Sequence, residues 1–176
     1  MKNTPLIYGK AARFFHWATA ILIAAMIPLG ITMADMADGS TKSTLYLIHA
    51  NLGFVVLILT ALRILWKFIE PAPSSPSGLS PARQWLFNAI HLGQYVFLIG
   101  LTLTGSATFL ATGPLAQNFP ETMAAALLSA LPGVHSVLSK GFIGLLLAHL
   151  TGLFQYQFTK GDVLTRMGLP KISLNL

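Results

Sequence analysis

Five histidines are the residues of this sequence best suited to chemistry, because all of them lie in or at the ends of long apolar stretches. They are His16, His49, His91, His135 and His149. An ionisable residue inside a membrane span is costly and marks a functional site by default. The alternative for any one of them is a neutral imidazole hydrogen-bonded to a neighbouring helix. The apolar stretches contain no Asp or Glu, which disfavours a proton-coupled transporter built on acidic relays.

The composition excludes several classes of protein. Of 176 residues, 54% are hydrophobic and 9% are charged, whereas soluble domains carry about 25% charged residues. The chain is also too apolar for disorder. Cysteine is absent, which excludes disulfides, cysteine-ligated iron–sulfur clusters and covalent C-x-x-C-H haem attachment. The net charge is +6, but the basic residues are too few and too dispersed to form a nucleic-acid-binding surface. A lipid bilayer is the favoured partner.

Four apolar stretches are long enough to span a bilayer, which needs roughly 20 residues of helix. They lie at about residues 14–33, 45–68, 85–110 and 134–158. The sequence therefore predicts an all-α, integral membrane four-helix bundle that forms one domain, residues 1–176. A further apolar run, residues 123–131, lies between Pro120 and Pro132. We expect it to form a short helix on the membrane surface.

The basic residues predict the orientation of the chain. Nine of the eleven fall on one side of a four-span topology, and Lys42 and Lys140 fall on the other. Cytoplasmic segments of membrane proteins carry the excess of Lys and Arg. We therefore expect a multi-pass protein of the bacterial inner membrane with both termini in the cytoplasm.

The histidines then separate into two depths. His135 and His149 are 14 residues apart, which is about 21 Å along a helix and a return to within about 40° of the same face. His49 begins the second span and matches His135 in depth, whereas His16 begins the first span and matches His149. Two imidazole pairs at different depths fit two haems b with paired histidine ligands, and they do not fit one zinc site. His91 has no partner in this arrangement. It is either an alternative to His16 as a haem ligand or part of a quinone site.

Small residues near the histidines are suited to leaving room for a flat cofactor. Gly53 lies one turn after His49, and the third span contains Gly100 and Gly105. Thr102, Thr104 and Ser106, on the same stretch, offer hydrogen bonds. Ordinary close packing of membrane helices through small residues is the alternative explanation.

Through these features the chain resembles the bacterial cytochrome b561 family. That family is in turn similar to the cytochrome b subunits of formate dehydrogenases and nickel–iron hydrogenases. The resemblance extends over nearly the whole chain. Its motifs, in order, are Arg13-Phe-Phe-His16-Trp17, Leu45-x₃-His49-x₃-Gly53, His91-x₃-Tyr95 with Thr104-Gly105, and His135-x₁₃-His149. It implies that His16 and His149 bind the iron of a cytoplasmic-side haem b, and His49 and His135 that of an outer one.

The resemblance also implies quinone chemistry, with one departure. Many members of the family carry two histidines where this chain has Tyr156 and Gln157. In members that oxidise superoxide, this region is implicated in binding quinone. We therefore place the candidate quinone site at His91, Gln94, Tyr156 and Gln157, where spans three and four reach the cytoplasmic side.

Three functions remain open from the sequence. The chain passes electrons between a periplasmic-side donor and ubiquinone or another quinone, with superoxide:ubiquinone oxidoreductase as one form of that activity. Alternatively, it is an electron-transfer subunit docked to a periplasmic redox protein, such as a dehydrogenase or cytochrome c. The third function is a non-redox role in membrane assembly or transport. The outer segments have a net charge of about −1, a poor attractor for an anion.

Overall fold

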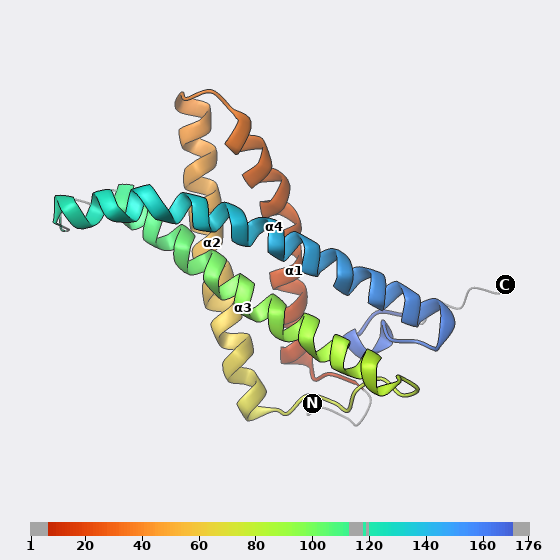
Figure 1. Ribbon diagram of the computed structural model, residues 1–176. Helices are drawn as coiled ribbons and strands as arrows, with labels where there is room; N and C mark the ends of the chain where they lie inside the picture. The colour runs from red at the N-terminus through yellow and green to blue at the C-terminus, as the bar shows by residue number, and fades with distance from the viewer. Residues whose placement is uncertain (1–6, 113–117, 119, 171–176) are drawn as a thin grey trace.

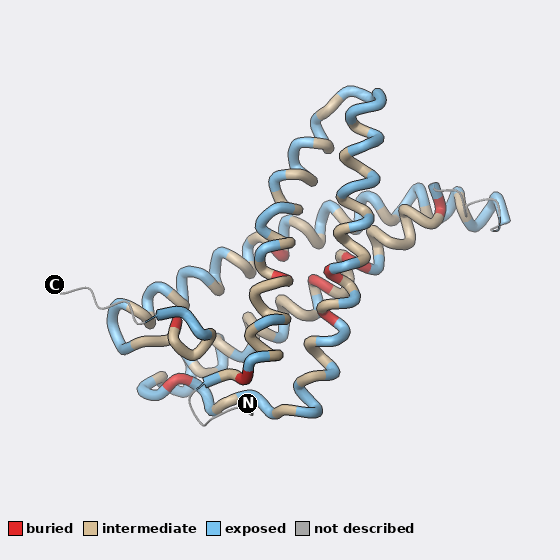
Figure 2. The backbone as a smooth tube through the Cα atoms, turned by 180° about the vertical axis from the view of Figure 1, so that it is seen from behind, coloured by how far each residue is buried: buried red, intermediate tan, exposed pale blue. Residues whose placement is uncertain are grey.

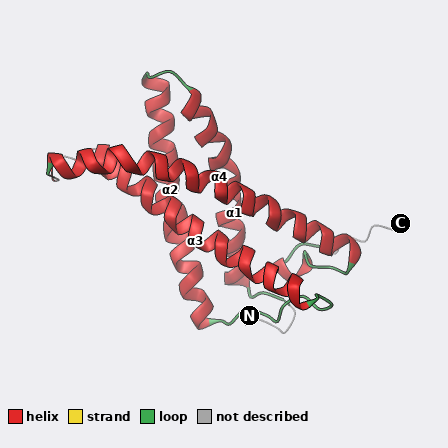
Figure 3. Cartoon of the chain, viewed as in Figure 1, coloured by secondary structure: helices red, strands yellow, loops and turns green. Residues whose placement is uncertain are grey.

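The computed structural model describes residues 7–112, 118 and 120–170. Within these residues the chain is all-helical and contains no strand, as Figure 3 shows. The predicted fold class is therefore confirmed. The four long helices are α1 (Lys10–Asp35), α2 (Ser40–Ile69), α3 (Pro81–Thr112) and α4 (Glu121–Thr159). Each of them is long and apolar enough to cross a membrane.

The starts of α3 and α4 follow from local chemistry. Pro81 opens α3, where its fixed φ and missing N–H are compatible with the first helical turn. Glu121 lies in the first turn of α4, where a negative charge interacts favourably with the helix dipole. After α4 a short 3-10 helix, η2 (Thr165–Met167), returns the chain toward α1.

The prediction of a separate surface helix between Pro120 and Pro132 is wrong. Residues 123–131 are instead the first turns of α4, which has 39 residues and continues through Pro132. Ala and Leu in this run favour helix strongly. An internal proline removes one backbone hydrogen bond and is tolerated where neighbouring groups satisfy the carbonyl that it frees. At 1.5 Å per residue α4 is about 58 Å long, so it extends beyond a hydrocarbon core of about 30 Å.

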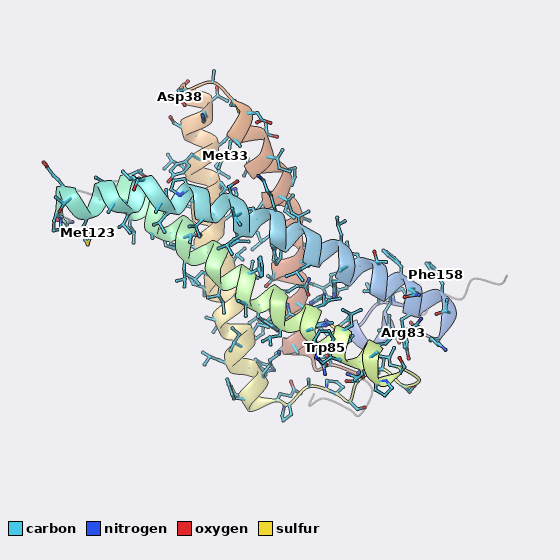
Figure 4. All side chains as sticks on the ribbon, in the orientation of Figure 1. Met33, Asp38, Arg83, Trp85, Met123 and Phe158 are labelled. Atoms are coloured by element: carbon cyan, nitrogen blue, oxygen red, sulfur yellow. The ribbon has the colours of Figure 1, made fainter. Side chains whose placement is uncertain are left out.

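The helices form two antiparallel hairpins, α1 with α2 and α3 with α4, and these hairpins cross (Figure 1). At the crossing α2 packs against α3. Figure 4 labels Asp38 at the tip of the first hairpin and Met123 near the tip of the second, and the two tips point in different directions. We call the ends with these tips the tip side, and the ends where α1 begins and α4 ends the terminus side.

The core lies where the hairpins cross. It consists of Val56 of α2, Leu98 of α3 and Phe142 of α4, against which Ile23 of α1 packs. Several of the buried residues gather at this crossing, and most of the remaining surface is exposed or half-buried (Figure 2). Many large apolar side chains face outward, as Phe68 does with 82% of its surface exposed. Such an apolar exterior suits lipid as its solvent.

Candidate functional site

A seven-residue spacing connects the core to two groups of functional side chains. On each helix one residue lies seven positions before the core residue and another lies seven positions after it. Seven residues are close to two helical turns, so successive positions are offset by about 20° and all three share one face to within about 40°. The triplets are His16, Ile23 and Gly30 on α1; His49, Val56 and Arg63 on α2; His91, Leu98 and Gly105 on α3; and His135, Phe142 and His149 on α4.

Two clusters therefore lie on opposite sides of the core. The tip-side cluster contains Gly30, His49, Thr104, Gly105 and His135. The terminus-side cluster contains His16, Arg63, His91 and His149. Each of the four helices contributes to each cluster, which explains how residues far apart in the sequence come together.

His49 and His135 face each other in the tip-side cluster. Their ring centroids are 6.4 Å apart and the ring planes are inclined by 77°. A metal ion binds imidazole nitrogen at about 2 Å, with the ring centre about 1 Å farther, so two rings across one metal ion have centres about 6 Å apart. The spacing of these two rings therefore fits paired axial ligands of one haem iron.

The surroundings of these two rings differ. Nδ1 of His135 lies 3.1 Å from Oγ1 of Thr104. Nδ1 of His49 is buried and has no hydrogen-bond partner among the described residues. A Cβ atom added at Gly105 would lie 3.2 Å from Cε1 of His135, and one added at Gly30 would lie 3.2 Å from Cε1 of His49. Both glycines therefore leave room for an imidazole.

The other glycines singled out from the sequence have different neighbours. A Cβ atom at Gly53 would make an ordinary contact of 3.7 Å with Met26, and one at Gly100 would press on Leu138 at 3.0 Å. The nearest protein neighbours of these two glycines are therefore apolar side chains of other helices and not histidines, and clearance for a cofactor beside them stays a prediction. Gly30, by contrast, lies next to His49 and was not singled out from the sequence.

The terminus-side cluster opens into a cavity of about 950 Å³ between the hairpins. His16, His91 and His149 all line it. Small-molecule and cofactor pockets have volumes of about 300–1,000 Å³, so this cavity is large enough for a haem-sized group. The segment that joins α2 to α3 contributes Ala72, Pro73, Ser75, Pro76 and Leu79 to its wall.

Within this cluster His91 contacts His149 directly. Their ring centroids are 5.0 Å apart and the planes are inclined by 81°. Nδ1 of His91 also donates to the carbonyl oxygen of Phe87, one turn earlier on the same helix, at 2.7 Å. The separation of the two rings is shorter than the spacing across one metal ion. His91 therefore lies beside His149, anchored to its own helix.

Arg63 reaches His16 from the neighbouring helix. Its Nη2 donates to Nδ1 of His16 at 3.0 Å, and its guanidinium carbon lies 5.2 Å from the centroid of the Tyr95 ring. The ammonium nitrogen of Lys67 lies 4.2 Å from the same centroid. Two cations therefore contact one aromatic ring in the cavity wall. The sequence places Arg63 and Lys67 near the end of a span and so predicts that they lie at the membrane interface. It does not predict their contact with Tyr95.

The four residues predicted for a quinone site separate into two groups. His91 and Tyr156 line the terminus-side cavity, and the hydroxyl of Tyr156 donates to the carbonyl oxygen of Ser77 at 2.9 Å. Gln94 and Gln157 are not among the described residues that line it. Gln157 instead accepts hydrogen bonds from the backbone N–H groups of residues 163 and 164, which positions the turn after α4.

The chain is similar to known proteins over most of its length. The chain matches the family model described as prokaryotic cytochrome b561 over residues 7–169, a range that includes all four helices. It is also similar to "Cytochrome b561 homolog 2" of Escherichia coli (strain K12). The two are 29% identical over 175 residues, which cover 94% of this chain and 93% of that protein.

Proposed function

The chain belongs to the prokaryotic cytochrome b561 family, and from that premise we propose that it passes electrons through two haems b between a periplasmic-side donor and the quinone pool. Membership makes it a prokaryotic membrane cytochrome that transfers electrons by haem. This sets aside the non-redox role. The number of haems, their ligands, the donor and the acceptor are our proposal.

The observation that carries the proposal is the placement of two histidine clusters on opposite sides of one apolar core. His49 and His135 hold the tip-side haem, and their 6.4 Å separation supports this. His16 and His149 hold the terminus-side haem, because both line the cavity there and come from different hairpins. For His16 this requires that Arg63 releases Nδ1, since a neutral imidazole whose Nδ1 accepts carries its proton on Nε2. His91 touches His149 too closely to be its partner across an iron. Haem b supplies one-electron oxidation and reduction when bound.

The orientation follows from the basic residues. Of the nine Lys and Arg residues that the structure describes, seven lie on the terminus side, which favours the cytoplasmic face for it. The tip side then faces the periplasm. Both termini are cytoplasmic in this arrangement, and the protein resides in the inner membrane.

The charge of the tip side favours a docked protein as donor over superoxide. Lys42 and Lys140 are the only bases assigned to that side. Lys42 forms a salt bridge with Asp38 at 3.0 Å and also donates to the carbonyl oxygen of Met36. Its charge is therefore partly offset by Asp38, and the exposed Lys140 is the other base on that side, so electrostatic steering of superoxide is weak. A dehydrogenase or cytochrome c docked at the tips is the favoured donor, and superoxide:ubiquinone oxidoreductase activity is the alternative.

Ubiquinone or another quinone is the proposed acceptor at the terminus-side cavity. His91 and Tyr156 offer polar groups at its wall, and Lys67 adds a positive charge there. Lys67 is the donor there for a carbonyl-bearing ring, because the Nδ1–H of His91 and the hydroxyl of Tyr156 already donate to the backbone carbonyl groups of residues 87 and 77. Gln157 contributes indirectly, by positioning the turn after α4, and nothing in the described structure links Gln94 to the cavity.

The first test is a dithionite-reduced minus oxidised spectrum of the purified protein, combined with haem counting per chain by pyridine haemochrome. We expect two low-spin haems b per chain. One haem, or none, in folded protein supplied with haem contradicts the proposal. Mixing the oxidised protein with a flux of superoxide, and separately with reduced cytochrome c, then identifies the donor by the rate of haem reduction.

A further inference from the structure

The hydroxyl group of Thr104 donates its proton to a backbone carbonyl oxygen of its own helix. Its Oγ1 donates to the carbonyl oxygen of Gly100 at 2.7 Å, with that of Leu101 at 3.1 Å. A threonine hydroxyl has one proton to donate and lone pairs that accept. Toward the His135 ring, 3.1 Å away, Thr104 therefore acts as the acceptor.

This assigns the tautomer of His135. If Oγ1 of Thr104 accepts, Nδ1 of His135 must carry the proton. In a neutral imidazole the other nitrogen, Nε2, then has a free lone pair. This is the form that binds a metal ion, and an acceptor at the outer N–H fixes the ring and makes it a more basic ligand.

The packing around the His135 ring also favours a fixed orientation of that ring. Gly105 is next to Thr104, and the missing Cβ leaves room for Cε1 of His135 at 3.2 Å. A single turn of α3 therefore supplies the space and two acceptors for the ring, the hydroxyl of Thr104 and the backbone carbonyl of Leu101. His49, on the opposite side of the proposed haem, has a buried Nδ1 with no partner in the described part of the chain. The two proposed ligands are thus unequal.

We propose that Thr104 is a positioning residue for His135, which holds the Nδ1–H tautomer and lowers the reduction potential of the tip-side haem. This inference rests on the proposed ligation of that haem by His135. Hydrogen-bond donation from Nδ1–H increases electron density at Nε2, which favours the ferric over the ferrous state. His135 is the firmly oriented ligand and His49 the weaker one.

Thr104→Val tests this inference, since valine has the same shape without the hydroxyl. We expect the potential of the tip-side haem to rise in a spectroelectrochemical titration, with no change at the other haem. Haem affinity at that site should fall by about 10–100-fold, as it does for other outer-shell partners of metal ligands. Thr104→Ser should restore both properties.

Thr102→Val is the matched control. Thr102 lies two residues earlier and is 6% exposed, and its hydroxyl also bonds to its own helix. The same substitution there should leave both potentials unchanged. An equal shift in Thr102→Val, no shift in Thr104→Val, or no rescue by Thr104→Ser overturns the inference.

His135→Ala separates this inference from the proposed function. If that variant keeps two haems, His135 is not a ligand, and both the ligand assignment and the role of Thr104 fail. If it loses one haem while Thr104→Val keeps the wild-type potential and affinity, only the inference about Thr104 fails.

Discussion

The rings of His91 and His149 are in contact at 5.0 Å, whereas those of His49 and His135 stand 6.4 Å apart. Both pairs meet edge to face, with ring planes inclined by 77° and 81°, but only the longer distance also matches the separation of about 6 Å expected across one metal ion. The two clusters are therefore not equivalent, although the same four helices build both.

The tip-side pair leads to the first prediction. His49→Ala and His135→Ala should each lose the same single haem, because a low-spin haem with two histidine ligands needs both. Haem counting should fall from two to one per chain in each variant. The spectrum of the remaining haem should be the same in both. Different residual spectra in the two variants would show that these histidines do not share one haem.

The terminus-side cluster offers three histidines for two axial positions. We expect His16→Ala and His149→Ala to lose the second haem, and His91→Ala to retain both. His91 is held beside His149 by its bond to the carbonyl oxygen of Phe87. The same haem count per chain is the measurement. If His91→Ala loses a haem while His16→Ala does not, the pairing of His16 with His149 is wrong.

Arg63 places a positive charge against His16. A nearby cation stabilises the extra electron of a reduced haem. Arg63→Gln should therefore lower the potential of the terminus-side haem, as measured by redox titration. Arg83→Gln removes a charge from the wall of the same cavity and is the control, for which a smaller decrease is expected. An unchanged potential in Arg63→Gln would exclude this arginine as a tuning residue.

Gly30 leaves space for the ring of His49. Gly30→Ala should displace that ring, since the new Cβ would lie 3.2 Å from Cε1, and so reduce occupancy of the tip-side haem. Gly144→Ala is the matched control, because nothing lies within 4 Å of a Cβ there. That control should retain both haems and gain about 0.5–1 kcal/mol of helix stability, measured by thermal unfolding. Full occupancy in Gly30→Ala would argue against the role of this glycine.

Much of the fold was predictable because helical periodicity is local. The 14-residue interval from His135 to His149 placed two imidazoles on one face of one helix, and the structure shows Phe142 at the midpoint, in the core. The helix through Pro132 was missed, since a proline normally ends a helix in water. The contact of Arg63 with His16 and the position of Gly30 beside His49 were also missed. They depend on how two hairpins cross, and spacing within one helix carries no information about that angle.

The crossed hairpins also bear on how the protein assembles. Each proposed ligand pair takes one histidine from the first hairpin and one from the second, so a haem held by either pair is a cross-link between halves that could insert into the membrane separately. Binding energy for such a group adds directly to the stability of the docked state. Cofactor supply would then limit the yield of correctly docked protein. Chains that receive no haem should be the ones that membrane proteases degrade.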